Sequence, residues 1–221
     1  MKKILVILSI FSVVTAYTQT QETIDSVTNQ ICKSISNSTI EPDSIKIETA
    51  FKKYFPPLIQ AIDSSKTEAV ITEIILRLQI TCYKFWKFID NTTPKNQYWK
   101  TIDSFSVSVC SKKDCDELFL KSNLYYYEPT GDKTKLKLSK DYWVDSLSDG
   151  SFSKLKLVRT TQCDFEIEFI ESNHPIKQKL SRAADKYYYR IISKEEHYYI
   201  MQVNLPLANK YSEFRIYFQS K

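Results

Sequence analysis

The last part of the chain alternates between apolar and polar positions with a period of two. In residues 163–170, Phe165, Ile167 and Phe169 alternate with three acidic residues, so one face of a strand would be apolar and the other charged. The connections to the next runs are too short for helical crossovers, which predicts an antiparallel meander. The later runs are rich in aromatic and β-branched residues and lie at residues 187–192, 198–205 and 214–218.

More strands are predicted before this meander. Alternation predicts strands at residues 105–109, 124–127, 134–138 and 142–147, and another that begins at Leu155. Asp149-Gly150 is typical of a hairpin turn, and residues 114–120 could form a helical turn. About eight antiparallel strands in this half favour a strongly curved sheet or a small lipocalin-like barrel.

The preceding residues have helical periodicity instead. Apolar positions three and four residues apart predict a helix at residues 23–36, a second from about Asp43, and a third from Ser65 to Ile89. Ser65 and Glu68 fit the capping-box pattern at the start of the third helix.

Pro56-Pro57 should end or kink the second helix, because proline lacks a backbone donor. The predicted fold class is therefore α+β. A three-helix unit at residues 21–93 precedes an antiparallel β domain at residues 97–221.

The first residues have the pattern of a secretory signal. Met1-Lys2-Lys3 precedes an apolar run at residues 4–14, which is shorter than the roughly 20 residues of a membrane-spanning helix. We assign the signal to residues 1–19, with cleavage expected after Ala16 or slightly later; a buried N-terminal helix is the alternative. The protein is expected to be exported, periplasmic or secreted, with no stable membrane insertion after the signal is removed.

The charge of the chain is modest and mixed in sign. The formal net charge is +5, and because Lys2 and Lys3 lie in the predicted signal, the mature chain would carry +3. No basic stripe stands out, so no nucleic-acid partner is expected. The chain has two glycines, which argues against loops that cradle phosphate groups.

Five cysteines follow the predicted signal, and in an exported protein they are expected to pair. Cys32 should meet Cys82, since each lies on the apolar side of a predicted helix. Cys110 and Cys115 could close a small loop, which would leave Cys163 free, or Cys163 could compete for either of them. The spacing does not fit a zinc site, so no metal is predicted.

Both halves resemble small exported proteins of Bacteroidota-type bacteria. In the helical half, the shared motifs are Ile31-Cys32, Ala50-Phe51 and Thr81-Cys82-Tyr83-Lys84-Phe85. In the β half, they are Asp149-Gly150-Ser151, Cys163-Asp164-Phe165-Glu166, Phe169-Ile170-Glu171-Ser172-Asn173 and Asp185-Lys186-Tyr187. The resemblance implies an exported α+β protein and supplies no activity, cofactor or site.

The residues that could support catalysis do not form a recognisable set. His174 and His197 fall in polar loops, and no G-x-S-x-G motif is present. Glu166 and Glu168 share one strand face, as they would on any solvated strand. We therefore predict a non-enzymatic protein with no catalytic residues and no cofactor, and keep a hydrolase with carboxylate chemistry as the weakest alternative.

Tyrosine is concentrated in the predicted strands, at residues 125–127, 187–189 and 198–199. Tyr126, Tyr188 and Tyr198 are candidate surface-binding aromatics; cross-strand stabilisation is the alternative. The expected function is binding or structural, with an unknown protein, a glycan or a small apolar ligand as partner. A lipocalin-like carrier of an apolar ligand is the second hypothesis, although bulky inward residues favour a filled barrel.

Overall fold

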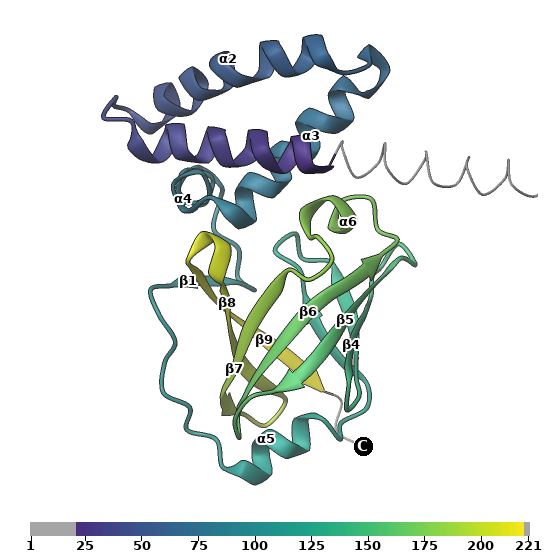
Figure 1. The fold of residues 1–221 in the computed structure, drawn as a ribbon. Coiled ribbons are helices and arrows are strands. Elements are labelled where there is room, and N and C mark those ends of the chain that lie inside the picture. The colour runs from purple at the N-terminus through teal and green to yellow at the C-terminus, as the bar shows by residue number, and fades with distance from the viewer. Residues whose placement is uncertain (1–20, 219–221) are drawn as a thin grey trace, which may run out of the picture. The chain divides into compact units, whose positions relative to one another are not determined.

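A computed structural model describes residues 21–218 of the chain (Figure 1). The architecture is α+β: an N-terminal helical region is followed by a closed eight-stranded antiparallel barrel with one additional strand. This confirms the predicted fold class. The chain divides into two compact units between Ile89 and Asp90. The predicted signal at residues 1–19 lies outside the described residues.

The helical unit packs around aliphatic residues that recur at helical spacing. Its elements are a helix over residues 21–37, α2 (Asp43–Ala61), a 3-10 turn η1 (Ser64–Lys66), α3 (Thr67–Thr81) and α4 (Tyr83–Thr92). Ile31 and Ile35 of the first helix are buried together with Ile74 and Leu78 of α3. Cys32 and Cys82 form a disulfide with their Cα atoms 5.5 Å apart, which confirms the predicted pairing.

Two details of the predicted helices were wrong. Pro56 and Pro57 do not end α2, which continues to Ala61, although each of them lacks a backbone N–H donor. The predicted third helix is broken at Cys82, whose backbone is extended.

The predicted capping box at Ser65 is also absent. Asp63 accepts hydrogen bonds from the backbone N and the hydroxyl of Ser65, at 2.8 and 2.7 Å. The carboxylate of Asp63 therefore caps the 3-10 turn, and α3 begins after Lys66 without a side-chain cap.

The barrel is an up-and-down meander, the strand arrangement found in lipocalins. Each strand from β2 to β9 pairs antiparallel with the next, and β9 pairs with β2 to close the ring. The short strand β1 pairs with residues 211–213 of β9. The barrel strands are β2 (Leu124–Tyr127), β3 (Lys133–Leu138), β4 (Tyr142–Ser146), β5 (Phe152–Arg159), β6 (Asp164–Ser172), β7 (Lys186–Lys194), β8 (Tyr198–Leu205) and β9 (Lys210–Phe218), with β1 at Lys100–Ile102.

Three short helices accompany the strands: α5 (Lys112–Leu118), α6 (Lys177–Leu180) and the 3-10 turn η2 (Pro206–Ala208). Figure 1 shows α5 and α6 at opposite ends of the barrel. The start of α5 has a capping box, in which Ser111 and Asp114 bond each other's backbone N–H groups.

Aromatic rings fill the interior of the barrel. Trp143 of β4 lies 5.2 Å from Tyr189 of β7, measured between ring centroids, so this contact crosses the interior between strands that are not neighbours. Tyr189 stacks on Phe165 at 5.3 Å and lies 6.2 Å from Phe214. Trp99 stacks on Phe214, with ring centroids 4.3 Å apart.

The strand predicted at residues 105–109 is absent. Val107 and Val109 are 83% and 78% exposed, and the segment lies against the outside of β7 and β8. β7 and β8 each have a strand partner on both sides, and the backbone contact of the segment lies past the end of the β6–β7 pairing, where Val109 N donates to Ile192 O at 2.8 Å. A side chain also holds the segment: Gln202 accepts from the backbone N of Ser106 at 2.7 Å.

The second disulfide differs from the predicted small loop. Cys115 pairs with Cys163, which attaches α5 to the start of β6, and Cys110 is free. The pairing of Cys110 with Cys115 was therefore wrong, and the alternative in which Cys163 competes for Cys115 is confirmed. Cys115 faces the barrel core from α5, whereas Cys110 precedes the helix and is only half-buried.

Two disulfides are typical of proteins in an oxidising compartment outside the cytoplasm. Among residues 21–218, no helix has the length and apolar character needed to cross a membrane.

Candidate functional site

One row of side chains runs across the outside of the barrel. Hydrogen-bond register aligns five residues on neighbouring strands β8, β9, β2, β3 and β4: Tyr198, Tyr217, Tyr125, Lys135 and Ser146. Directly opposed residues of paired strands share a face of the sheet. The strand neighbours of this row are buried inside the barrel, so the row itself faces outward.

The tyrosines of this row belong to a larger stack, which we call the tyrosine ladder: Tyr98, Tyr125, Tyr127, Tyr198 and Tyr217. Tyr125 stacks on Tyr217 with centroids 5.2 Å apart and planes at 15°, and Tyr198 lies 5.6 Å from Tyr217. Tyr127 contacts both Tyr125 and Tyr217 and stacks on Tyr98 at 4.7 Å. In the two stacked pairs, Tyr125 with Tyr217 and Tyr98 with Tyr127, each ring covers one face of its partner.

The ladder carries cations at two places. The Nζ of Lys133 lies 3.7 Å from the ring centroid of Tyr125, and the guanidinium of Arg215 lies 5.0 Å from that of Tyr198. Such cation–π contacts hold a positive charge over an electron-rich ring. Partial burial, then the nearby Tyr127 and Tyr217, raise the pKa of Tyr125, so its hydroxyl remains a hydrogen-bond donor near neutral pH.

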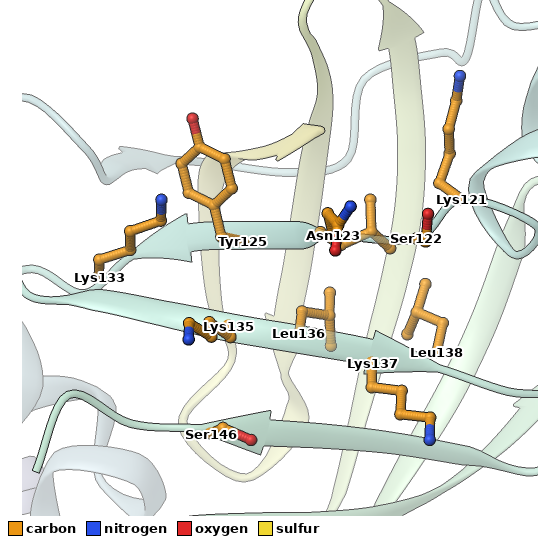
Figure 2. Close-up of a pocket in the computed structure, with 11 residues that line it drawn as sticks. Lys121, Ser122, Asn123, Tyr125, Lys133, Lys135, Leu136, Lys137, Leu138 and Ser146 are labelled. Carbon is orange, nitrogen blue, oxygen red and sulfur yellow. The ribbon is translucent and has the colours of Figure 1, made fainter. Parts of the chain in front are cut away.

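A hollow of about 450 Å³ lies beside the ladder, over β2, β3 and the residues before β2 (Figure 2). Four lysines line it: Lys121, Lys133, Lys135 and Lys137. Its other lining residues are polar and uncharged (Ser122, Asn123, Tyr125 and Ser146) or are leucines with little exposure (Leu124, Leu136 and Leu138). We call the ladder and this hollow together the Tyr–Lys surface.

Three of these lysines form a row of like charge. Lys133, Lys135 and Lys137 occupy alternate positions of β3 and are all exposed, so they lie roughly 7 Å apart along one face. Within residues 21–218, none of the three has a carboxylate within 4 Å. Lys121 differs, since it pairs with Glu117 at 2.7 Å. Like charges on one sheet face destabilise it, and no carboxylate of the described chain offsets this cost.

The three tyrosines predicted to bind a partner lie in three different environments. Tyr126 is 6% exposed and lies inside the barrel, so its prediction as a surface residue was wrong. Alternation in β2 turns Leu124 and Tyr126 inward and leaves Tyr125 outward. Tyr188 is exposed on β7, and Tyr198 belongs to the ladder.

Sequence reasoning missed most of the Tyr–Lys surface. The alternation of lysine with leucine in residues 133–138 already identifies the outward positions of β3, and a cross-check against β2 would have favoured Tyr125 and Tyr127 over Tyr126. The alignment of Tyr217 with Tyr125 depends on barrel closure, for which the sequence has no local signal.

The histidines are not brought together. The Nδ1 of His174 accepts hydrogen bonds from the backbone N of Ile176 and Lys177, and its Nε2 lies 3.8 Å from Asp149. His197 is exposed at the turn between β7 and β8, next to Glu196.

The paired glutamates of β6 are neutralised on the outside of the barrel. Lys186 lies 2.9 Å from Glu166 and 4.0 Å from Glu168. In the described part of the chain, no group of three or more His, Cys, Asp or Glu side chains is placed to hold a metal ion.

A second polar cluster lies inside the barrel, near α6. Asp145 is buried and accepts a hydrogen bond from the indole Nε1 of Trp143 at 2.8 Å. Burial raises the pKa of Asp145 to about 7, opposed by Lys177 and the Trp143 hydrogen bond and reinforced by Glu128. Glu128 itself accepts from Lys177 Nζ at 2.7 Å and from Thr134 Oγ1 at 3.1 Å. A raised carboxyl pKa can accompany acid–base chemistry, but Asp145 is 5% exposed, so this cluster mainly attaches α6 to the barrel.

No protein-family model, curated protein or solved structure matches the chain. The fold and the site define a class: a disulfide-linked α+β protein whose barrel contains packed aromatic rings and carries an external surface of tyrosines and lysines, three of which have no carboxylate partner among the described residues. The chemistry of that surface carries the functional argument.

Proposed function

We propose that the protein is an exported, non-enzymatic binding protein that holds its ligand on the outside of the barrel, at the Tyr–Lys surface. One observation carries the proposal: Lys133, Lys135 and Lys137 project together beside the tyrosine ladder and lack carboxylate partners in the described chain. Folding alone would favour neutralising such a row. Departures from that expectation are typical of sites that serve a partner.

Export is part of the proposal and is supported by two features. The predicted signal and the two disulfides both fit a protein of the periplasm or of the extracellular space. Tyrosine next to cations is also a composition typical of binding surfaces, because tyrosine combines apolar area with a hydroxyl.

The interior of the barrel supports an external site over a carrier function. A carrier needs an internal cavity of a few hundred Å³. The contacts of Trp143, Tyr189, Phe165 and Phe214 cross the interior, where such a ligand would lie.

The test compares retention of the mature protein on washed cell-envelope material from its own host. The surface variant is Lys135→Gln/Lys137→Gln, and the control is Lys33→Gln/Lys66→Gln, which removes the same charge from exposed lysines of the helical unit. Wild type and control should be retained at low salt, whereas the surface variant should remain in solution. Equal retention of both variants would contradict the proposal.

Native mass spectrometry before and after organic extraction tests the carrier alternative on the same samples. A small molecule that is lost on extraction from wild type and surface variant alike would favour the carrier.

A further inference from the structure

The hollow of the Tyr–Lys surface combines two kinds of hydrogen-bonding groups. The ammonium groups of Lys133, Lys135 and Lys137 suit carboxylates or sulfates. The hydroxyls of Ser122 and Ser146 and the amide of Asn123 can each donate and accept, as sugar hydroxyls require (Figure 2).

Resting on the function proposed above, we propose that the Tyr–Lys surface binds an acidic polysaccharide. Its carboxylate or sulfate groups contact the lysines of β3, and its hydroxyl groups contact the uncharged residues of the hollow and the tyrosine hydroxyls at its border.

The dimensions of the surface fit a polymer with repeated charges. The three lysines repeat at roughly 7 Å along β3, which presents several cations to one extended chain. The outward row from Tyr198 to Ser146 crosses five strands, a path of roughly 19 Å at about 4.8 Å per strand. Several weak contacts along such a path add up to useful affinity.

Other polyanions fit less well. Single-stranded nucleic acid stacks its bases on free aromatic faces, whereas the ladder rings Tyr125 and Tyr217 cover each other. An acidic peptide that adds as a strand needs a long open edge, and β3 is paired with β2 at residues 133–136 and with β4 at residues 135–138. A membrane surface needs apolar side chains that can insert beside the cations, and the three leucines that line the hollow, Leu124, Leu136 and Leu138, are 9% exposed or less.

Binding is measured by isothermal titration calorimetry of the mature protein against heparin as a sulfated chain, polygalacturonate as a carboxylated chain and dextran as a neutral chain. Binding is expected to at least one acidic polysaccharide, and the preferred one identifies the anionic group. Dextran should not bind. The Lys135→Gln/Lys137→Gln variant should lose about tenfold or more in affinity, while Lys33→Gln/Lys66→Gln keeps wild-type affinity.

A second variant separates sugar recognition from charge alone. Ser122→Ala/Ser146→Ala should weaken binding to the acidic polysaccharide by about threefold or more and leave binding to inorganic polyphosphate unchanged. Equal loss for both ligands, or no loss for either, would overturn the inference. Circular dichroism of each variant confirms that it is folded.

The outcomes separate the two proposals. Equally tight binding of single-stranded DNA, polyglutamate or anionic vesicles would overturn the ligand class. Absence of binding to every acidic polysaccharide would also overturn the ligand class. In that case, loss of envelope retention in the lysine variant would still support a binding function. If the lysine variant changes neither retention nor affinity, both proposals fail.

Discussion

Two outer faces of the barrel carry rows of like charge. They differ in whether a neighbouring strand supplies side chains of the opposite charge. On β6, Asp164, Glu166 and Glu168 project outward at alternate positions, as the three lysines do on β3. The neighbouring β7 supplies cations: Arg190 lies 2.7 Å from Asp164, and Lys186 lies 2.9 Å from Glu166.

The lysine row on β3 has no such partners within residues 21–218. Across from Lys133 and Lys135 on β2 stand tyrosines, and across from Lys135 on β4 stands Ser146. The barrel therefore neutralises the charged row on β6 and leaves the row on β3 without a carboxylate partner among the described residues. This difference is the reason for proposing a partner from outside the chain at the Tyr–Lys surface.

The largest expected effect concerns Asp145, a carboxyl with burial but no ion pair among the described residues. Its pKa in the folded protein is raised to about 7, above about 3.9 for an exposed aspartate. The folded state therefore binds the proton more tightly, so the stability it contributes is present at low pH and lost as pH rises toward 7. Asp145→Asn should raise the free energy of unfolding by about 2–4 kcal/mol near pH 8, and by less near pH 5.

Denaturant unfolding at the two pH values measures this difference. Asp141→Asn is the matched control, since Asp141 is exposed. Equal gains for Asp145→Asn at both pH values, or a loss near pH 8, would contradict the account of Asp145.

The paired face should respond in the opposite direction. Partial burial raises the pKa of Asp164, but hydrogen bonds from Arg190 and Thr161 outweigh it and lower the pKa overall. The stability from this pair is present at neutral pH and is lost as pH falls through the folded pKa, below about 4. Asp164→Asn should cost about 1–2 kcal/mol near neutral pH, because Arg190 then lacks its counter-charge. Unfolding curves should converge with wild type in acid; convergence at neutral pH as well would mean that the pair contributes nothing.

A single charge reversal should give the lysine row a neighbouring side chain of opposite charge, as the acidic row on β6 has. Lys135→Glu places a carboxylate between Lys133 and Lys137, which lie two positions away on the same face. Replacing repulsion by attraction should raise the free energy of unfolding by about 0.5–1 kcal/mol at low salt. Thermal unfolding at low and high salt tests this, with Lys33→Glu in the helical unit as control. A destabilised Lys135→Glu protein would show that the row is not strained by repulsion.

The sequence predicted strands and their faces best where the two faces differ in chemistry. Phe165 and Ile167 alternate with glutamates, so the inward set of β6 was unambiguous and is buried. In β2, apolar and polar residues do not alternate, because tyrosine occupies both faces at residues 125–127. The pattern therefore could not identify the inward face. The valines of residues 105–109 alternate with serine, but the segment lies against β7 and β8, which already pair with other strands along most of their length.

Of the two disulfides, one could be predicted from local sequence patterns, and the other depends on how distant segments pack. Helical phase placed Cys32 and Cys82 on apolar faces, and they pair. Close spacing suggested Cys110 with Cys115, but α5 turns Cys115 toward β6, where Cys163 lies 48 positions further along the chain. Most of the candidate site could not be predicted from the sequence, because it also depends on contacts between distant residues. Tyr125 and Tyr217 meet only through the β2–β9 pairing that closes the barrel.

The smallest expected effect on stability is the most informative about function. Lys135→Gln/Lys137→Gln removes like-charge repulsion without adding attraction, so the free energy of unfolding should stay equal to wild type or rise by up to about 0.5 kcal/mol at low salt. High salt should erase the gain, because the Debye length falls to roughly 3 Å at 1 M salt, which is shorter than the roughly 7 Å between these lysines. Lys33→Gln/Lys66→Gln should show no gain at either salt concentration.

The same double variant is expected to lose ligand affinity, so its stability and its binding should move in opposite directions. A residue kept for folding would show both losses together. If Lys135→Gln/Lys137→Gln lowers the free energy of unfolding by about 1 kcal/mol or more, the lysines serve the barrel itself, and the contrast between the two outer faces no longer points to a ligand.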